Sequence, residues 1–356
     1  MPAGPLIAKG MDSPPRHARL TVDRAALVAN WRAFAAASGA AACGAAIKAD
    51  GYGLGARGVA DALVAAGCRD LFVAHWHEVA ELGPLPPDVR VAVLHGVMAD
   101  DMAAALASPA VPVLVTAAQV AAWKVTGRPC DVMVDTGMNR LGLSVAEARS
   151  GLLDGLALDT LHSHLACSED RAHPLNEAQR AAFADLAAAV PARRHALANS
   201  GGIGLGASYC FSLTRPGIGL YGGGPGPTGA PLAAVASLSS RIIQLRDVSA
   251  GASIGYGATF SADRPLRVAV VALGYADGYP RSLSNRGAAI VGDVRCPLVG
   301  RVSMDLTVFD VTGAPGLGEG DWLDIDFGLA EAARASGRTE YELLVGLGAR
   351  YARVYR

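Results

Sequence analysis

The chain has 356 residues, of which 51% are hydrophobic and 18% charged, and its 31 basic and 32 acidic side chains leave a net charge of -1. So much apolar surface excludes a globally disordered chain, and the length predicts about two domains. Basic and acidic residues are nearly balanced, unlike the basic surface of a nucleic-acid-binding protein, so we expect a small polar metabolite as the partner. No apolar run reaches the roughly 20 residues that a membrane span requires.

The cysteines and the N-terminal residues indicate the cellular location of the protein. The six cysteines stand far apart, without a C-x-x-C pair, which is typical of reduced thiols in a cytosolic protein rather than of a disulfide framework. Residues 1–16 lack the apolar run of a secretory signal, and we expect them to form a frayed tail. The expected location is therefore the cytoplasm.

Short apolar runs alternate with helical patterns from Leu20 to about Gly224. Asp23 is a favourable N-cap for a first helix, which places Leu27, Trp31 and Phe34 on one face. Capping boxes predict two later helices, after Thr116 and after Ser144. The expected buried strands are the run ending at Lys48 and the segments 71–74, 91–94, 113–115, 132–134, 158–164, 195–199 and 210–214.

This alternation predicts βαβ units and, with about eight or nine strands, a (β/α)8 TIM-type barrel. The alternative, an open doubly wound sheet, calls for a G-x-G-x-x-G turn after the first strand, which the segment after Lys48 does not cleanly supply. Beyond the Gly/Pro-rich stretch 222–231 the pattern becomes strand-like, with a two-residue hairpin loop at Gly292-Asp293. We expect the barrel over 17–235 and a C-terminal mostly β domain over 236–356.

Polar groups follow the expected strands at the end where barrel enzymes carry their active sites. They are Lys48, His75, His95, Arg140, His164, Asn199, Ser200 and Arg215.

Lys48 leaves a buried strand and precedes a glycine-rich turn, which suits a Schiff-base lysine of depressed pKa or, alternatively, a lysine that extends to solvent. The loops 199–202 and 215–219 are either ordinary turns or phosphate-binding loops, whose glycines allow close approach of an anion. Together with Lys48 they suggest a phosphorylated aldehyde cofactor.

The chain resembles the alanine racemase family in a series of short segments. The block 46–53, Ala-Ile-Lys-Ala-Asp-Gly-Tyr-Gly, is similar to the family's attachment motif for pyridoxal phosphate. Further similar segments follow in the family's order and extend the resemblance from Thr21 to Tyr351, namely 135–142, 162–166, 198–200, 215–222, 255–260, 274–281 and 300–305.

The resemblance implies a pyridoxal-phosphate-dependent alanine racemase with two catalytic bases. Lys48 would carry the cofactor and serve as one base, and Tyr256 would be the other, on the opposite face of the substrate. In the family this tyrosine comes from the partner subunit, so the resemblance implies a homodimer with shared active sites. It also implies no metal, no nucleic acid and no membrane.

The resemblance assigns the remaining site residues. Arg215 would face the pyridine nitrogen, with His164 hydrogen-bonded to it, and would disfavour protonation of that nitrogen. Arg140, Met304 and Tyr275 would bind substrate or shape the entrance. The phosphate side of the cofactor would be held by Tyr52, Asn199, Ser200, Gly217, Ile218 and Tyr351.

One departure concerns Arg140. Many family members have a lysine seven residues earlier whose carbamylated form braces that arginine, whereas this chain has Met133. Arg140 must be oriented otherwise, and Asn139 or a bound anion are the candidates.

Three other functions stay open from the sequence. A serine or broader-specificity racemase differs by only one hydroxyl in the substrate. A pyridoxal-phosphate-binding protein without turnover would lack Tyr256 and the β domain, and a fold-related decarboxylase would not place Arg215 at the pyridine nitrogen. Whether D-alanine supplies peptidoglycan precursors or alanine is catabolised also stays open.

Overall fold

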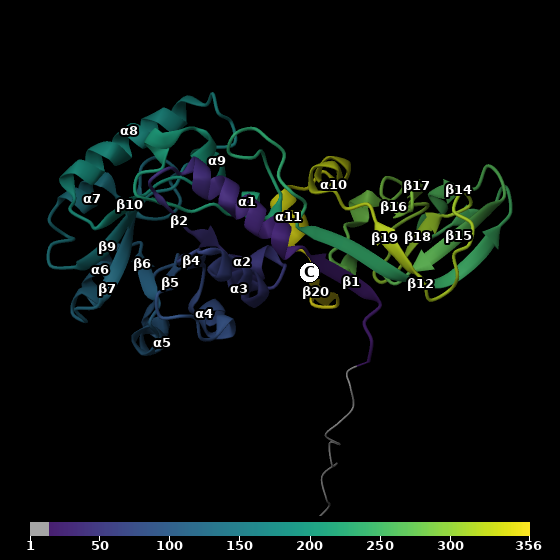
Figure 1. Cartoon of the computed structure of the whole chain (residues 1–356), viewed down its shortest axis with the longest axis horizontal. Coiled ribbons are helices and arrows are strands. Elements are labelled where there is room, and N and C mark those ends of the chain that lie inside the picture. The colour runs from purple at the N-terminus through teal and green to yellow at the C-terminus, as the bar shows by residue number, and fades with distance from the viewer. Residues whose placement is uncertain (1–13) are drawn as a thin grey trace, which may run out of the picture.

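The computed structural model describes residues 14–356, which form two lobes joined by a narrow waist (Figure 1). The expected tail, residues 1–16, lies almost entirely outside the described residues. Within 14–356, no helix combines the length and apolarity needed to cross a bilayer. Each of the six cysteines is free.

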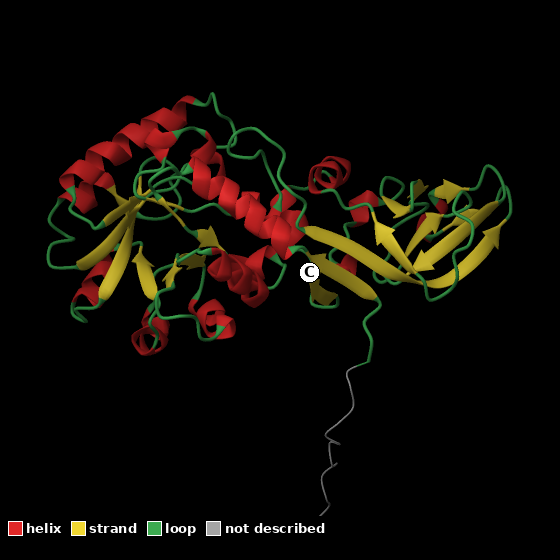
Figure 2. Cartoon of the chain, viewed as in Figure 1, coloured by secondary structure: helices red, strands yellow, loops and turns green. Residues whose placement is uncertain are grey.

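The first lobe is the expected barrel of parallel strands surrounded by helices (Figure 2). Its strands run in the order β3 (Ala45–Ala46), β4 (Asp70–Val73), β5 (Arg90–Val93), β6 (Val111–Leu114), β7 (Pro129–Asp135), β9 (Ala157–His162) and β10 (Arg194–Ala196). A short strand β8 (Leu143–Ser144) pairs with β7, and β11 (Leu213–Thr214) pairs in parallel with β2 (Ala42–Cys43).

Backbone hydrogen bonds close the ring between the first and last strands. The N–H of Ala46 donates to the carbonyl of Pro216 at 2.9 Å, and the N–H of Arg215 donates to that of Ala198 at 2.8 Å. The polar groups that follow β3, β9, β10 and β11 therefore meet at one mouth.

The barrel helices begin where the sequence predicts. Asp23 caps α1 by accepting from the N–H of Ala26 at 2.9 Å, and Leu27, Trp31 and Phe34 are buried. Thr116 caps α6, and Ser144 forms a capping box with Glu147 at α7. The helices of this lobe are α1 (Arg24–Ala37), α2 (Lys48–Tyr52), α3 (Ala56–Ala66), α4 (Trp76–Leu82), α5 (Met102–Ala107), α6 (Ala117–Lys124), α7 (Val145–Arg149), α8 (Pro174–Ala189) and α9 (Ser200–Gly204).

The second lobe is mostly β, as predicted. The expected hairpin at Gly292-Asp293 joins two antiparallel strands, with Val291 opposite Val294. Its elements are β12 (Ala236–Val248), β13 (Ser253–Ile254), β14 (Phe260–Ser261), β15 (Leu266–Val271), β16 (Ala288–Val291), β17 (Val294–Pro297), β18 (Thr307–Asp310), β19 (Trp322–Ile325), α10 (Leu329–Ser336) and α11 (Glu340–Val345).

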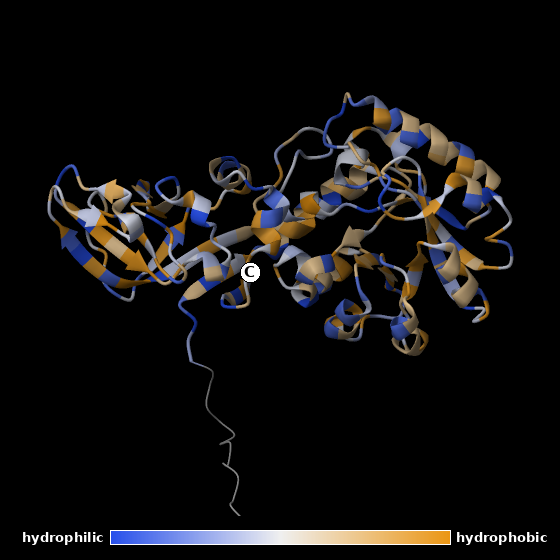
Figure 3. Cartoon of the chain, turned by 180° about the vertical axis from the view of Figure 1, so that it is seen from behind, coloured by the Kyte–Doolittle hydropathy of each residue, from blue (hydrophilic) through white to orange (hydrophobic). Residues whose placement is uncertain are grey.

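The two ends of the described chain meet at the waist. Strand β1 (Ala18–Val22) pairs antiparallel with β12 and parallel with β20 (Ala352–Tyr355). Leu20 of β1 and Leu343 and Leu344 of α11 are fully buried there, and the ribbon near the waist includes orange, hydrophobic segments in Figure 3. From β20, the hydroxyl of Tyr355 donates to the carbonyl of Leu54 and Arg353 donates to that of Gly53, both at 2.9 Å. The end of the chain therefore fastens the segment that follows Lys48.

Candidate active site

Lys48 begins a left-handed turn directly after the first barrel strand. The φ angles of Ala49, Asp50, Gly51 and Tyr52 are 53°, 53°, 61° and 55°, although only one of the four is glycine. Such a conformation is costly for residues with a Cβ and persists only where the surroundings hold it. Glu78 is one such support, because its carboxylate accepts from the N–H of Ala49 at 2.5 Å.

The surroundings of Lys48 favour its neutral amine. Burial lowers the pKa of Lys48, the charges of Arg140 and Arg215 lower it further, and Glu78 acts in the opposite direction. A neutral amine is the nucleophilic form that attacks a carbonyl carbon.

Arg215 lies at the end of β11 and is 5% exposed. Its Nη1 donates to the carbonyl of Ala196 at 2.8 Å, and its Nη2 donates to that of Ser163 at 2.6 Å. Burial lowers the pKa of Arg215 to about 10, against the opposing charge of Asp131. The guanidinium is thus a fixed cation within the barrel.

Two histidines, one at the end of β9 and one in the loop after it, lie beside Arg215, and only the second was expected from the sequence. His164 Nδ1 lies 3.4 Å from Arg215 Nη2. His162, which was missed, is closer, with Nδ1 2.9 Å from Nη1. Burial lowers the pKa of His164 to about 3, followed by the charges of Arg215 and Arg140, so the imidazole is neutral. The sequence signal for His162 was its position at the end of β9, two residues before His164.

Ser200, Gly217 and Tyr52 form a compact group of donors beside Arg215. The hydroxyl of Ser200 accepts from the N–H groups of Gly217 at 2.9 Å and Gly219 at 3.2 Å. A Cβ at Gly217 would lie 2.3 Å from the Tyr52 hydroxyl, so a larger residue would force the ring or the loop to shift. Ile218 is buried in the same loop. Hydroxyls and backbone N–H groups suit a phosphate.

Two neighbours order this group. The side chain of Asn199 caps α9 by accepting from the N–H of Gly202 at 2.9 Å. The ring of Tyr52 stacks on Tyr221 with centroids 4.5 Å apart, and the Tyr221 hydroxyl donates to the carbonyl of Ala46 at 2.9 Å. The sequence reasoning did not find Tyr221.

The C-terminal tyrosine that lies against Tyr52 is Tyr341, at 6.3 Å between centroids, and not Tyr351. Tyr351 is 1% exposed, and its hydroxyl has no hydrogen-bond partner among the described residues. Burial raises its pKa, followed by the effects of Asp277 and Tyr279. Its expected contact with a phosphate stays a prediction.

Arg140 is held through its backbone. Its N–H donates to Asp135 at 2.9 Å, and Asn139 before it has a φ of 56°. Its side chain is exposed and makes no hydrogen bond or ion pair within residues 14–356, so Asn139 does not brace it there. Met133 is 7% exposed and packs in the core.

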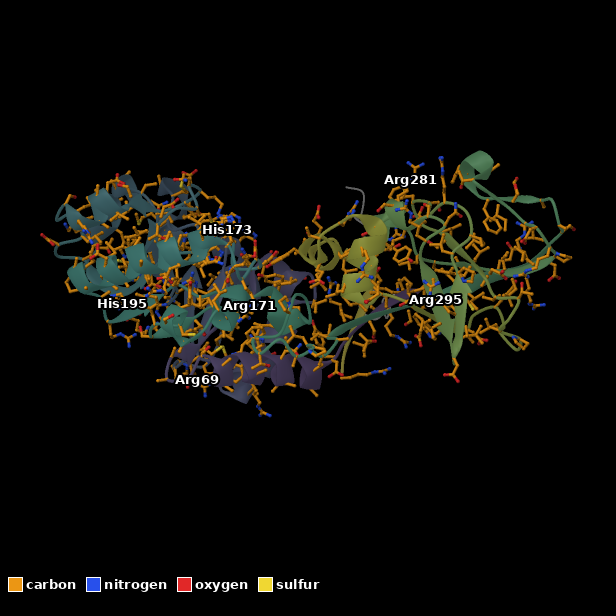
Figure 4. The ribbon with its side chains drawn as sticks, turned by 90° about the horizontal axis from the view of Figure 1, so that it is seen from above. Arg69, Arg171, His173, His195, Arg281 and Arg295 are labelled. Atoms are coloured by element: carbon orange, nitrogen blue, oxygen red, sulfur yellow. The ribbon has the colours of Figure 1, made fainter. Side chains whose placement is uncertain are left out.

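The site residues expected from the β lobe are exposed to solvent. Tyr256 is 70% exposed, Tyr275 44% and Met304 54%. The N–H of Ala276 donates to the carbonyl of Met304 at 3.0 Å, which ties the last two loops together. No hydrogen bond of the described residues joins this group to Lys48. Figure 4 places Arg281 on the β lobe, apart from Arg171 and His173 on the barrel.

The barrel mouth therefore fits a phosphorylated aromatic aldehyde. It offers an amine of lowered pKa at Lys48, phosphate donors at Ser200 and Gly217, and a buried cation at Arg215 for a ring nitrogen. Glu78 is the nearby carboxylate, but its oxygens are occupied by backbone N–H groups.

Comparisons with known proteins agree with this geometry. Two family models match, the alanine racemase N-terminal domain over residues 22–225 and the alanine racemase C-terminal domain over 235–355. An alanine racemase of Rhizobium meliloti (strain 1021) is 43% identical, over 95% of this chain and 96% of that protein. One of Acidiphilium cryptum (strain JF-5) is 43% identical, over 96% of this chain and 99% of that protein.

A solved structure extends the likeness to three dimensions. The crystal structure of alanine racemase from Bartonella henselae with covalently bound pyridoxal phosphate is similar, with a TM-score of 0.88 and 35% identity. The match covers 96% of this chain and all (100%) of that one.

Proposed function

The chain belongs to the alanine racemase family, and on that premise we propose that it interconverts L-alanine and D-alanine with pyridoxal phosphate as cofactor. The observation that carries the proposal is Lys48, an amine at the barrel mouth. Its pKa is lowered by burial and by the positive charges of Arg140 and Arg215. When bound, pyridoxal phosphate supplies the electron sink that makes the α-proton of an amino acid acidic.

The barrel residues hold and orient the cofactor in this proposal. Lys48 is the point of covalent attachment, and Arg215, steadied by His164, faces the ring nitrogen. Because a cation disfavours protonation of that nitrogen, the electron sink is kept weak and side reactions are suppressed. The phosphate would be held by Tyr52, Ser200, Gly217 and Ile218, with Asn199 beside them and Tyr341 as the C-terminal tyrosine next to Tyr52.

Two bases move the proton on opposite faces of the substrate carbon. The Lys48 amine would take or give the proton on one face, and the Tyr256 phenol would do so on the other. Racemisation requires both, since one group removes the proton and the other returns it on the opposite side.

Tyr256 is supplied by the β domain of a second copy. Its 70% exposure and its lack of contact with Lys48 in the same chain support this arrangement. The same copy would bring Met304 and Tyr275 to the entrance, where Met304 and Arg140 bind the substrate carboxylate. The working unit is therefore a homodimer with shared sites.

The setting we propose is the cytoplasm, where free cysteines persist. There the enzyme would make D-alanine for peptidoglycan. Complementation of a D-alanine auxotroph tests that role, and a chain that racemises alanine in vitro but fails to restore growth would contradict it.

The reaction is tested with the purified protein and pyridoxal phosphate. We expect an absorbance band of the lysine-linked cofactor, D-alanine formed from L-alanine, and, after borohydride reduction, the adduct on Lys48. Lys124→Ala is the matched control, because Lys124 lies on α6 and donates only to the carbonyl of Leu152. It should keep both band and activity, whereas Lys48→Ala should lose both. If the band appears but alanine is not racemised, serine becomes the proposed substrate. If no band appears, the proposal that pyridoxal phosphate is the cofactor is refuted.

A further inference from the structure

A buried polar chain runs through the barrel behind Arg215. The carboxylate of Asp131 and the ring of His162 are both 0% exposed. Asp131 Oδ2 lies 2.9 Å from His162 Nε2, and His162 Nδ1 lies 2.9 Å from Arg215 Nη1. The imidazole thus bridges a carboxylate and a guanidinium, and neither ring nitrogen is left for solvent.

The two partners determine which ring nitrogen carries the proton. Arg215 has only donors, so His162 Nδ1 must accept. Asp131 is ionised and only accepts, so His162 Nε2 must carry the hydrogen. Burial lowers the pKa of His162 to about 4, with Asp131 opposing, so the ring holds a single proton at neutral pH.

Asp131 stays ionised although burial opposes its charge. Burial raises its pKa, but the hydrogen bond from His162 and the hydrogen bond and charge of Arg90 outweigh burial and lower it. Arg90 Nη2 donates to Asp131 Oδ1 at 2.5 Å, and the N–H of Thr160 donates to the same oxygen at 3.0 Å. Each oxygen of Asp131 therefore faces donors, and the amide of an asparagine would be mismatched on one side.

We propose that Asp131 and His162 are positioning residues for the racemase reaction: Asp131 selects the Nε2–H form of His162, which leaves Nδ1 to hold the Arg215 guanidinium toward the cofactor ring. The function of this pair rests on the proposed function, because Arg215 matters to catalysis only if it faces the ring nitrogen. The negative charge of Asp131 also raises the pKa of Arg215, against the effect of burial. One carboxylate therefore selects the tautomer of His162 and helps to keep Arg215 charged.

The substitution Asp131→Asn separates these effects from simple packing. The asparagine amide keeps its oxygen toward Arg90 and Thr160, where two donors converge, and points its NH2 at His162 Nε2. The imidazole must then accept at Nε2 and carry its hydrogen on Nδ1, where it meets the N–H of Arg215 donor to donor. Asp159→Asn is the matched control, because Asp159 lies 3.4 Å from the same Arg90 and has no contact with His162.

Substitutions of His162 give an independent test. The amide of a glutamine has an oxygen and an NH2 group spaced much like the two ring nitrogens, so it can accept from Arg215 and donate to Asp131. Leucine can do neither. We therefore expect His162→Gln to preserve the function and His162→Leu to lose it.

The primary measurement is 15N NMR of histidine-labelled, cofactor-free protein, in which the signals missing from His162→Gln identify His162. We expect a neutral ring with hydrogen on Nε2 in the native chain and in Asp159→Asn, and on Nδ1 in Asp131→Asn. The second measurement is the alanine racemisation of the loaded proteins. For Asp131→Asn and His162→Leu we expect kcat to fall by about 10-fold or more, the scale of one hydrogen bond to a charged group. KM should change little, and the glutamine variant should stay close to native.

Two results would overturn the proposal. One is an Asp131→Asn chain that retains the Nε2–H form and native kcat, and the other is a leucine variant as active as the glutamine variant. Because the tautomer is read without cofactor, a native chain that shows the Nε2–H form but does not racemise alanine would refute the proposed function instead.

Discussion

The carboxylate of Glu78 accepts a hydrogen bond from the backbone N–H of Ala49, the residue after Lys48, at 2.5 Å. Its other oxygen accepts from the N–H groups of Ala74 at 2.6 Å and His75 at 3.0 Å. One buried side chain thereby links the ends of two neighbouring strands and supports a turn of positive φ angles. The direction in which Lys48 leaves the barrel depends on this link.

The variant Glu78→Gln should destabilise the fold. In either orientation, the amide NH2 faces at least one backbone N–H, which leaves a buried donor unpaired. We expect the free energy of unfolding to fall by about 1–3 kcal/mol, measured by urea denaturation. The variant Glu81→Gln, one turn along the same helix and exposed, should show no change. Equal stability of both variants would contradict the assigned role of Glu78.

The variant Gly217→Ala should weaken cofactor binding. The added Cβ would lie 2.3 Å from the Tyr52 hydroxyl, so the tyrosine ring or the loop must shift. Either shift would disturb the donors that are proposed to hold the phosphate. We expect the dissociation constant for pyridoxal phosphate to rise about 10-fold or more, roughly 1.4 kcal/mol, in a titration followed by absorbance. At Gly313, the Cβ meets only Val294 at an ordinary 3.6 Å, so Gly313→Ala should bind as the native chain does.

The reactivity of Lys48 should extend to lower pH than that of an ordinary lysine. Its pKa is lowered by burial and then by Arg140, so a larger fraction of the amine is neutral at a given pH. Removing the cation in Arg140→Met raises the pKa of Lys48, and the midpoint of amine labelling in cofactor-free protein should move to higher pH. Arg149→Met, at the ion pair with Asp185, should leave the midpoint unchanged. A midpoint unaffected by Arg140 would show that the two groups do not interact.

Mixing inactive variants tests whether Tyr256 acts across the dimer. In a heterodimer of Lys48→Ala and Tyr256→Phe chains, one site regains both native bases if the tyrosine comes from the partner. Random reassociation of equal amounts should then restore about a quarter of native activity, because half of the dimers are mixed and each has one intact site of two. If base and lysine belonged to the same chain, the mixture would remain inactive.

The architecture was predictable from the sequence because its signals are local. The cap at Asp23, the capping box at Ser144 and the hairpin at Gly292-Asp293 each depend on a few neighbouring residues, and all three are confirmed. The barrel followed from the regular alternation of strands and helices, and the resemblance to a family named Lys48 and Arg215.

The contacts around the site were less accessible because they join distant segments. Asp131 and His162 are 31 residues apart, and a lone histidine in a strand gives no sign of its partner. The tyrosine beside Tyr52 is Tyr341, whereas the resemblance named Tyr351 for the phosphate, because the contact between residues 52 and 341 joins segments far apart in the sequence. Within residues 14–356 the side chain of Arg140 makes no hydrogen bond, and Met133 by itself gives no sign of what would take the place of the family's lysine.

The pairing of β20 with β1 also bears on how the molecule assembles during synthesis. Residues 353 and 355 fasten the carbonyls of Gly53 and Leu54, about 300 positions earlier in the chain. A nascent barrel on the ribosome therefore lacks two of the contacts that hold the segment after Lys48 until β20 has been synthesised. Contacts of such long sequence separation form late in folding, so competence to bind cofactor should arise only after residue 355 is made, and chains that stop short of residue 352 should remain without it.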